Sequence, residues 1–331
     1  MRTDRLAKLI ADWEPQIAEA FLAAVREITN EVRFSDLVAA IKAGDVEGAI
    51  RLVGLDPLQF RALDRAIEQA FEDAGVQTMQ GMRGPLGLRL APRFDFRAPD
   101  AQAWLRSHAT ELIRQITDDQ RVLIRQALAP LRSPLDPMIT GDTPQKLALD
   151  LVGRVNRATN AREGGILGLT SQQARWAANY AREVANADPA ALTRLLRDRR
   201  YDATIRKAIR TGQPIAKDLQ ERMVEAYRSR ALRRRAETIA LNEAGEVLRR
   251  AQQEAWDQVI ARGVVAETRV KRFWITVGDD RVRPTHAAVP GMNKEGVGLK
   301  QPFQTPKGPA LNPGWSFDPG CRCRVRIRLA E

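Results

Sequence analysis

Apolar side chains recur at helical spacing along most of this chain. Between residues 6 and 28 they fall three or four positions apart, as the buried face of an amphipathic helix requires. Glycine, proline and capping residues separate this segment from others with the same spacing, and a proline-rich break falls at residues 130–141. The same spacing predicts further helices over residues 35–42, 45–53, 57–78, 99–127, 147–162, 172–187, 197–210, 215–230 and 231–262. Most of the chain is therefore expected to be helical.

The pattern changes after Gly263. Residues 272–277 are rich in β-branched and aromatic side chains, and residues 321–329 alternate apolar and basic side chains without interruption. On a strand, this alternation places one set of side chains inward and the other outward. The inward set is Cys321, Cys323, Val325, Ile327 and Leu329, and the outward set is Arg322, Arg324, Arg326 and Arg328. At least two strands are therefore expected near the C-terminal end of the sequence.

The expected fold class is mainly α with a small C-terminal α+β module. It consists of an elongated helical body followed by a short antiparallel β-sheet. Three consecutive domains are expected: a helical region over residues 1–98, a helical body with a basic end over 99–235, and a long helix with the small β module over 236–331.

Composition narrows the class of protein. Hydrophobic residues make up 44% of the 331 positions, which is too many for a disordered chain. No apolar run approaches the roughly 18 residues needed to cross a bilayer, and the first residues lack the apolar core of a secretion signal. The two cysteines are typical of a reducing cytoplasm, and the two histidines leave little material for histidine-based catalysis. A soluble protein without enzymatic activity is expected.

The net charge of +12 is concentrated in the C-terminal part of the chain. Residues 194–235 carry 14 basic and 5 acidic side chains. Such a segment indicates either a polyanionic partner or a solvated helix face. Aromatic residues do not interleave with the basic ones, so any nucleic acid would be bound through its phosphates. The candidate contacts are Arg233, Arg234, Arg235, Arg322, Arg324, Arg326 and Arg328.

A polar turn and a cysteine pair carry the candidate chemistry. Asp279, Asp280, Arg281, Arg283 and His286 follow the first predicted strand, where an aspartate that accepts hydrogen bonds from an arginine would brace the strands. The cysteines at 321 and 323, with that histidine and a nearby aspartate, have the donor types of a zinc site.

The one-residue gap between the cysteines is unusual for zinc, and their alternation with apolar residues favours buried core cysteines without a metal. The weaker alternatives are a zinc site at His286, Cys321 and Cys323, a redox pair, and a thiol or metal-dependent hydrolase.

Several separated motifs resemble one family. Residues 233–258, 272–292 and 318–323 resemble the tailed-phage head morphogenesis proteins, which are minor capsid proteins related to the F protein of phage Mu. The resemblance covers residues from about 195 onward. The matching positions are Arg235, Ala236, Glu237, Ile239, Ala240, Glu243, Trp274, Asp279, Arg281, Arg283, His286, Cys321 and Cys323. Three positions depart from the family pattern: Leu241 and Asn242 stand where the family commonly has arginine and threonine, and Gly320 where asparagine is usual.

The resemblance implies a minor head protein that associates with the portal. Such a protein acts in head morphogenesis, genome packaging or DNA delivery, without catalysis and without a cofactor. The implied partners are the portal protein, other head proteins and packaged double-stranded DNA, and neither a membrane nor a small-molecule substrate is expected. The implied location is the virion head near the portal, after synthesis in the host bacterial cytoplasm. Non-specific DNA binding through residues 194–235 is the alternative function.

Overall fold

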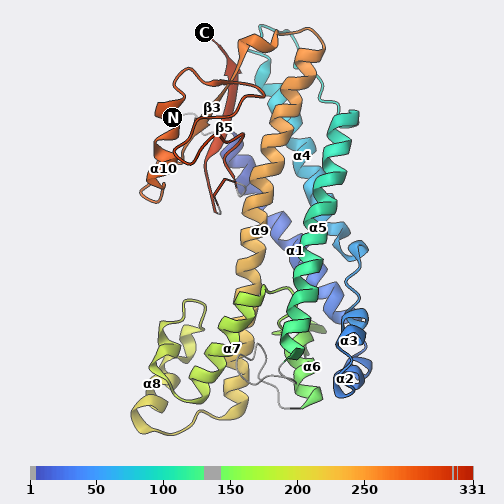
Figure 1. Ribbon diagram of the computed structural model, residues 1–331, viewed down its shortest axis with the longest axis vertical. Helices are drawn as coiled ribbons and strands as arrows, with labels where there is room; N and C mark the ends of the chain where they lie inside the picture. The colour runs from blue at the N-terminus through green and yellow to red at the C-terminus, as the bar shows by residue number, and fades with distance from the viewer. Residues whose placement is uncertain (1–4, 130–142, 315–316, 319, 331) are drawn as a thin grey trace. The chain divides into compact units, whose positions relative to one another are not determined.

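The computed structural model describes residues 5–129, 143–314, 317–318 and 320–330. Helices make up most of these residues, and short antiparallel strands form two small sheets (Figure 1). In chain order the elements are α1 (Arg5–Glu31), α2 (Phe34–Lys42), α3 (Val46–Val53), η1 (Pro57–Phe60), α4 (Arg61–Met82), α5 (Pro99–Leu128), α6 (Pro144–Val152), β1 (Arg154–Asn156), β2 (Ala161–Glu163), α7 (Ser171–Ala185), η3 (Pro189–Thr193), η4 (Arg199–Tyr201), α8 (Asp202–Thr211), α9 (Lys217–Ala261), η5 (Glu267–Arg269), β3 (Val270–Ile275), α10 (Pro284–Ala287), α11 (Val289–Met292), β4 (Val297–Gly298) and β5 (Arg324–Leu329). The predicted fold class, mainly helical with a small C-terminal β module, is confirmed.

Capping side chains explain where several helices begin. Thr143 accepts a hydrogen bond from the backbone N–H of Lys146 at the start of α6. Thr170 and Gln173 form a capping box at the start of α7, in which each side chain bonds to the other residue's backbone N–H. The predicted break at residues 130–141 lies outside the described residues. Among the helices of the described residues, none is both long enough and apolar enough to cross a membrane.

The prediction of one helix over residues 147–162 is wrong. Helix α6 ends at Val152, and a short hairpin of β1 and β2 follows, with Arg154 opposite Glu163. Gly153 has a φ of 84°, and a Cβ atom there would lie 2.3 Å from the carbonyl oxygen of Glu163. The helix therefore ends at this glycine because the chain turns tightly back on itself.

The helices expected over residues 215–230 and 231–262 are one helix, α9, which is 45 residues long. Neither glycine nor proline interrupts the sequence around Ala231, so backbone hydrogen bonding continues through it. The buried stripe changes from large side chains such as Tyr227 to small ones such as Ala236 and Ala240. That change in side-chain size, rather than a break in the backbone, divides the apolar pattern in two.

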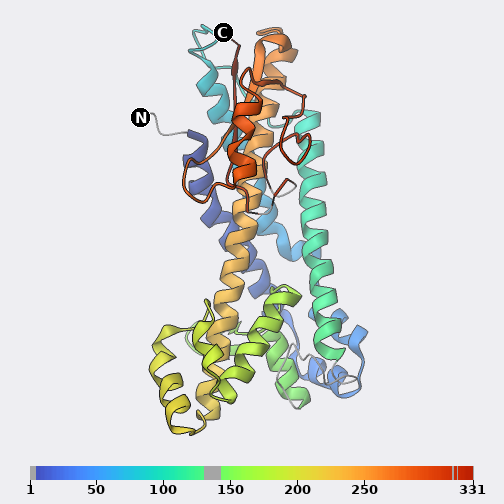
Figure 2. The same ribbon diagram turned by 60° about the vertical axis from the view of Figure 1, so that its left-hand side comes forward.

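The C-terminal sheet has the order β4-β3-β5, and all its pairs are antiparallel. Trp274 of β3 lies opposite Val325 of β5. The strand expected over residues 321–329 begins only at Arg324, so both cysteines precede it. Burial nevertheless alternates from Cys321 to Ile327, as the pattern predicts. The sheet lies beside the C-terminal half of α9 (Figures 1 and 2), and Trp256 of that helix and Ile327 line the same pocket.

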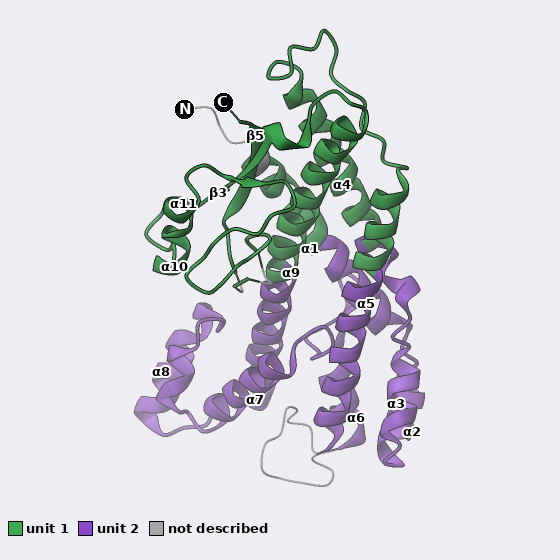
Figure 3. Cartoon of the chain, turned by 45° about the horizontal axis from the view of Figure 1, so that its top comes forward, with its two compact units in different colours: residues 1–18, 64–109, 237–331 green, residues 19–63, 110–236 purple. Residues whose placement is uncertain are grey.

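Two compact units make up the chain (Figure 3). One unit comprises residues 1–18, 64–109 and 237–331, and the other comprises residues 19–63 and 110–236. We call them the sheet unit and the helical unit. This division differs from the three consecutive domains expected from the sequence, because α1, α5 and α9 each contribute residues to both units. The start of the last segment, at 237, lies one residue from the expected boundary at 236.

Each unit has an aromatic cluster in its interior. In the helical unit, Tyr180 of α7 stacks on Tyr227 of α9 with ring centroids 4.8 Å apart. In the sheet unit, Trp104 stacks between Phe71 and His108, with centroid distances of 5.6 and 4.6 Å. These contacts join helices that are distant in sequence and so bring together the segments of each unit.

Candidate functional site

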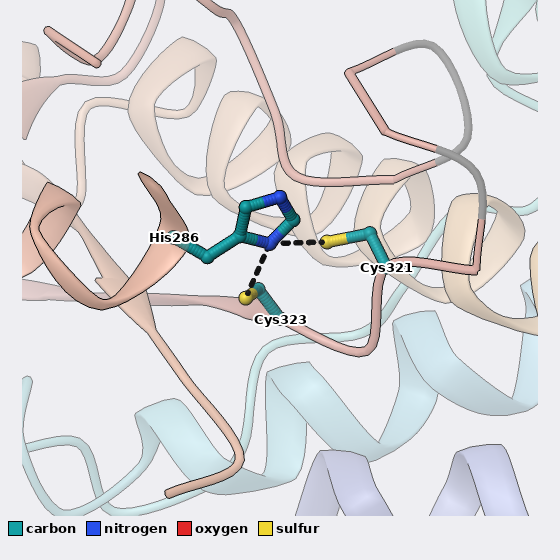
Figure 4. Close-up of side chains that lie close together, drawn as sticks. All are labelled: His286, Cys321 and Cys323. Atoms are coloured by element: carbon teal, nitrogen blue, oxygen red, sulfur yellow. Dashed lines mark hydrogen bonds between the residues drawn. The ribbon is translucent and has the colours of Figure 1, made fainter. Parts of the chain in front are cut away.

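A histidine and both cysteines of the chain converge in the sheet unit. His286 lies on the short helix α10, and Cys321 and Cys323 lie in the stretch before β5. The imidazole Nδ1 of His286 is 3.5 Å from the Sγ atom of each cysteine (Figure 4). The side chains are buried, with 2%, 8% and 4% of the three residues exposed, and the cysteines are free thiols. The three potential ligand atoms lie within 4.8 Å of one another.

The other nitrogen of the His286 ring is held by a carboxylate. Asp318 Oδ2 lies 2.9 Å from Nε2 and 2.6 Å from Nζ of Lys307, and Nη1 of Arg283 is 3.7 Å away. Hydrogen bonds from Lys307 and His286, together with the charge of Arg283, lower the pKa of Asp318 to about 2. Because the ionised carboxylate can only accept, Nε2 carries the proton in the neutral ring, and the lone pair of Nδ1 faces the two sulfurs.

Aromatic side chains enclose this histidine. Trp274 of β3 meets the His286 ring edge-to-face at 6.3 Å, and Phe317 lies 5.1 Å from it. The cysteine pair is coupled: the hydrogen bond with Cys323 lowers the pKa of Cys321, and the same contact together with burial raises the pKa of Cys323.

Arg272 is a structural residue that the sequence reasoning did not single out. It is fully buried on β3 and donates to the carbonyl oxygens of Gln301 and Leu311 at 2.8 and 2.7 Å. Its guanidinium also lies over the ring of Phe303, 5.0 Å from the centroid, and burial lowers its pKa to about 10. The sequence feature that could have identified Arg272 is its inward-facing position on a strand, between the inward-facing Val270 and Trp274. Arg272 thereby fixes the loop that carries Phe303 against the sheet.

Asp279 of the polar turn pairs with Arg281, which belongs to the predicted turn, and more closely with Arg322, which does not. Asp279 accepts a hydrogen bond from Nη2 of Arg322 at 2.6 Å and another from the backbone N–H of Arg281 at 3.2 Å. The hydrogen bond with Arg322 is the main cause that lowers the pKa of Asp279. Arg283 of the same turn faces Asp318, and Asp280 is exposed. The turn is therefore tied to the residue between the two cysteines.

The motif residues on α9 do not join this cluster. Arg235 is buried in the helical unit, where it donates to the carbonyl oxygen of Gly168 at 3.0 Å and to Asp119 at 3.1 Å. Its guanidinium is occupied within the protein, which corrects the expectation that it contacts nucleic acid. Glu243 lies in the sheet unit, 2.6 Å from Nε2 of His108, and Glu237 is exposed.

The other candidate nucleic-acid contacts differ in exposure. Arg233 and Arg234 are exposed on α9, and Arg326 is exposed on β5. Arg328 is exposed too, with its guanidinium 4.3 Å from the ring centroid of Phe273. Arg322 is paired with Asp279, and Arg324 is half-buried.

Many basic side chains of residues 194–235 are neutralised within the helical unit. Carboxylates pair with them both locally and across elements, as in the ion pair between Arg228 and Asp150 at 2.6 Å. The paired arginines are Arg194, Arg197, Arg200, Arg206, Arg222, Arg228, Arg230 and Arg235. Fewer of the segment's basic side chains are therefore free to contact a partner than its composition indicates.

Comparisons with known proteins find no matching family model, no similar curated protein and no similar solved structure.

Proposed function

We propose that this chain is a minor head protein of a tailed phage, which acts beside the portal in head morphogenesis, genome packaging or DNA delivery and has no catalytic role. The proposal rests on several motifs between residues 233 and 323, which resemble those of the phage Mu F-like family and occur in the same order along the chain. Its proposed location is the virion head, and its proposed partners are the portal protein, other head proteins and packaged DNA.

One structural observation supports the proposal. Pieces of the family pattern that are far apart in sequence pack around a common centre: Trp274 from β3, His286 from α10, and Cys321 and Cys323. Asp279 and Arg322 tie the same pieces together at a second point. The part of the shared pattern from Trp274 to Cys323 therefore lies in one small folded module, as expected when these residues maintain a docking surface.

The test is the presence of the chain in particles and its contact with the portal. In purified particles of the encoding phage, mass spectrometry should detect the chain in far fewer copies than the major capsid protein. Co-expressed with the portal protein of that phage, the full chain should co-elute with it in size-exclusion chromatography. Absence from particles, or separate elution at micromolar concentrations of both proteins, would contradict the proposal.

A matched pair of variants locates the contact. Arg326→Glu reverses an exposed charge on the β5 strand of the sheet unit, and Arg233→Glu does the same on α9 of the helical unit. If the motif-bearing module docks on the portal, only Arg326→Glu should weaken co-elution. Loss of co-elution in the Arg233 variant alone would assign the docking surface to the other unit.

Non-specific DNA binding is a second candidate function. Arg199, Lys207 and Arg210 are exposed cations at η4 and α8, and they favour contact with a phosphate backbone. The ion pairs of the other arginines weigh against a large contribution from this segment. The two functions are compatible, because a protein inside a DNA-filled head gains from an exposed basic surface.

A further inference from the structure

We propose that His286, Cys321 and Cys323 bind one Zn²⁺ ion through Nδ1 and the two Sγ atoms. Imidazole nitrogen and thiolate sulfur are the ligands that zinc prefers in proteins. Among the described residues, these three side chains form the group whose potential ligand atoms lie close enough together to hold one metal ion. The inference concerns the site alone and holds whether or not the chain is a phage head protein.

The spacing of the three atoms matches a tetrahedral zinc site. With Zn–S bonds of about 2.3 Å and a Zn–N bond of about 2.0 Å, tetrahedral angles place nitrogen and sulfur about 3.5 Å apart. The distance from Nδ1 of His286 to Sγ of Cys321 is 3.5 Å, and the distance to Sγ of Cys323 is also 3.5 Å. Both nitrogen–sulfur distances therefore equal those of a tetrahedral zinc site, and all three atoms lie within 4.8 Å of one another.

Hydrogen bonding alone explains only part of this arrangement. A neutral imidazole with its proton on Nε2 has a single lone pair on Nδ1, which accepts one S–H donor well. Two sulfurs nevertheless lie at the same distance from that nitrogen. A metal ion between the three atoms gives each sulfur an equivalent role, because each then donates its own lone pair to the ion.

Asp318 supplies the outer partner that zinc-binding histidines usually have. Such a histidine commonly donates its second N–H to a carboxylate, which fixes the orientation and tautomer of the ring. Here Asp318 Oδ2 lies 2.9 Å from Nε2, on the side of the ring away from the sulfurs, and Lys307 holds the carboxylate in place at 2.6 Å. Asp318 is thus a positioning residue for the proposed ligand His286.

A thiol nucleophile is the competing interpretation. Cys321, His286 and Asp318 also have the order of a thiol, a base and the carboxylate that orients it. A nucleophile must reach a substrate, however, and only 8% of Cys321 is exposed. That interpretation also leaves Cys323 without a role, whereas zinc uses both sulfurs.

A water molecule is the proposed fourth ligand of the zinc ion, since the cluster contains three protein donors.

The first experiment measures metal content. The full chain, purified without added metal or chelator, should contain about one zinc per chain by mass spectrometry of the elements. His286→Gln and Cys323→Ser should each lose it. The chain has two histidines, so His108→Gln is the matched control and should retain zinc. Zinc in the wild-type chain that persists in both the His286 and Cys323 variants would overturn the assignment.

The second experiment uses only the wild-type chain and so does not depend on the folding of variants. After reduction and removal of zinc, Co²⁺ should bind with a thiolate-to-cobalt charge-transfer band and the intense visible bands of tetrahedral Co²⁺. Both cysteines of the chain lie in the proposed site, so the charge-transfer band reports this site. A metal-free protein that binds no Co²⁺ would overturn the proposal. Rapid alkylation of Cys321 alone in that protein would favour the nucleophile instead.

A third measurement tests the role of Asp318. Asp318→Asn should weaken zinc affinity by about 10- to 100-fold, because the ring loses its orienting carboxylate. Asp280→Asn removes an exposed carboxylate from the same module and should leave the affinity unchanged. Equal affinities of the two variants would remove Asp318 from the site and contradict this part of the proposal.

Discussion

Several charged side chains of this protein are buried together with specific partners. Arg272 is enclosed by the sheet and two loop carbonyl groups, and Arg235 by Asp119 and a carbonyl oxygen. His108 lies between Trp104 and Glu243 in the sheet unit. Burial of such groups costs several kcal/mol unless hydrogen bonds compensate for the lost water. Each pair therefore makes a prediction that can be tested by substitution.

His108 should make stability depend on pH. Burial disfavours its charged form, but the hydrogen bond and charge of Glu243, with the charge of Glu246, outweigh burial and raise the pKa of His108. A pKa above the unfolded value of about 6.5 means that protonation favours the folded state. This stabilisation is present below that pH and is lost as the pH rises through the folded pKa.

Denaturant unfolding of the wild type and His108→Gln measures this effect. The variant should be less stable than the wild type by about 1–2 kcal/mol at about pH 5.5. The difference in stability should be smaller at about pH 8.5. A difference in the free energy of unfolding that does not change with pH would contradict the prediction.

Arg235 should be a stability residue. Arg235→Ala removes two hydrogen bonds and leaves the carbonyl oxygen of Gly168 without this donor, at a cost of about 2–4 kcal/mol. Arg233→Ala, two positions away on the exposed face of α9, should change stability by less than about 0.5 kcal/mol. Equal thermal shifts for the two variants would show that the buried ion pair contributes nothing.

At the scale of elements, two tight connections bring distant residues together. The hairpin of β1 and β2 turns the chain back immediately after α6, and the turn at Asp279 is tied to the stretch that leads into β5. Neither connection contains much apolar surface. Their geometry instead depends on one glycine in the first connection and one ion pair in the second.

Gly153→Ala should destabilise the helical unit more than Gly212→Ala. Both glycines have positive φ values, but Gly212 (φ 66°, ψ 4°) is left-handed helical, where alanine costs about 1 kcal/mol. Gly153 (φ 84°, ψ 175°) lies in a backbone region that is essentially limited to glycine, so the strain of alanine there is larger. At Gly153 the new methyl group would also overlap the carbonyl group of Glu163, whereas the space around Gly212 is open. We expect a total cost above about 2 kcal/mol for the first variant, measured by denaturant unfolding. Equal costs would contradict the close approach.

Asp279→Ala should lower the melting temperature of the full chain. The substitution removes the acceptor of the Arg322 guanidinium and so frees the turn from the stretch that carries the cysteines. Asp280→Ala is the matched control, because that neighbour is exposed, and it should melt as the wild type does. If both variants melt unchanged while particle assembly fails, the turn is a contact surface and not a brace.

At the scale of the whole molecule, net charge and available charge differ. The segment 194–235 has the largest local excess of basic residues, yet carboxylates of the helical unit pair with many of them. Sequence counting treats every arginine as equally available. The structure separates exposed cations such as Lys207 and Arg210 from buried ones such as Arg228.

Salt-dependent DNA binding tests the exposed cations. If the full chain binds random duplex DNA through them, the combined Lys207→Gln and Arg210→Gln variant should reduce the slope of log affinity against log salt by about two. Lys42→Gln removes an exposed cation of the same unit outside the segment and should leave the slope unchanged. Binding that is insensitive to salt would exclude this function for the segment.

Local signals predicted much of the fold. Thr143 and Thr170 precede helices that begin where capping chemistry requires, and strand alternation correctly divided buried from exposed residues around Val325. The hairpin after Gly153 was missed because its conformation depends on contact with Glu163, which lies ten residues later.

The sequence identified the residues of the candidate site but not their arrangement. The motifs named His286, Cys321 and Cys323. Their equal 3.5 Å separations, and the carboxylate of Asp318 behind the ring, depend on how α10 packs against the stretch before β5. Such packing across more than thirty residues leaves no periodic signal in the sequence.

The interleaved composition of the two units has a consequence for biosynthesis. A ribosome completes residues 19–63 and 110–236 before it adds residue 237, so the helical unit has all its residues first. Met82, which is buried in the finished sheet unit, lines one pocket with Trp256 and Ile327 and must therefore wait for the final segment. A stalled product ending at 236 would therefore combine a complete unit with an apolar surface that has no cover, and chaperones and proteases recognise such surfaces.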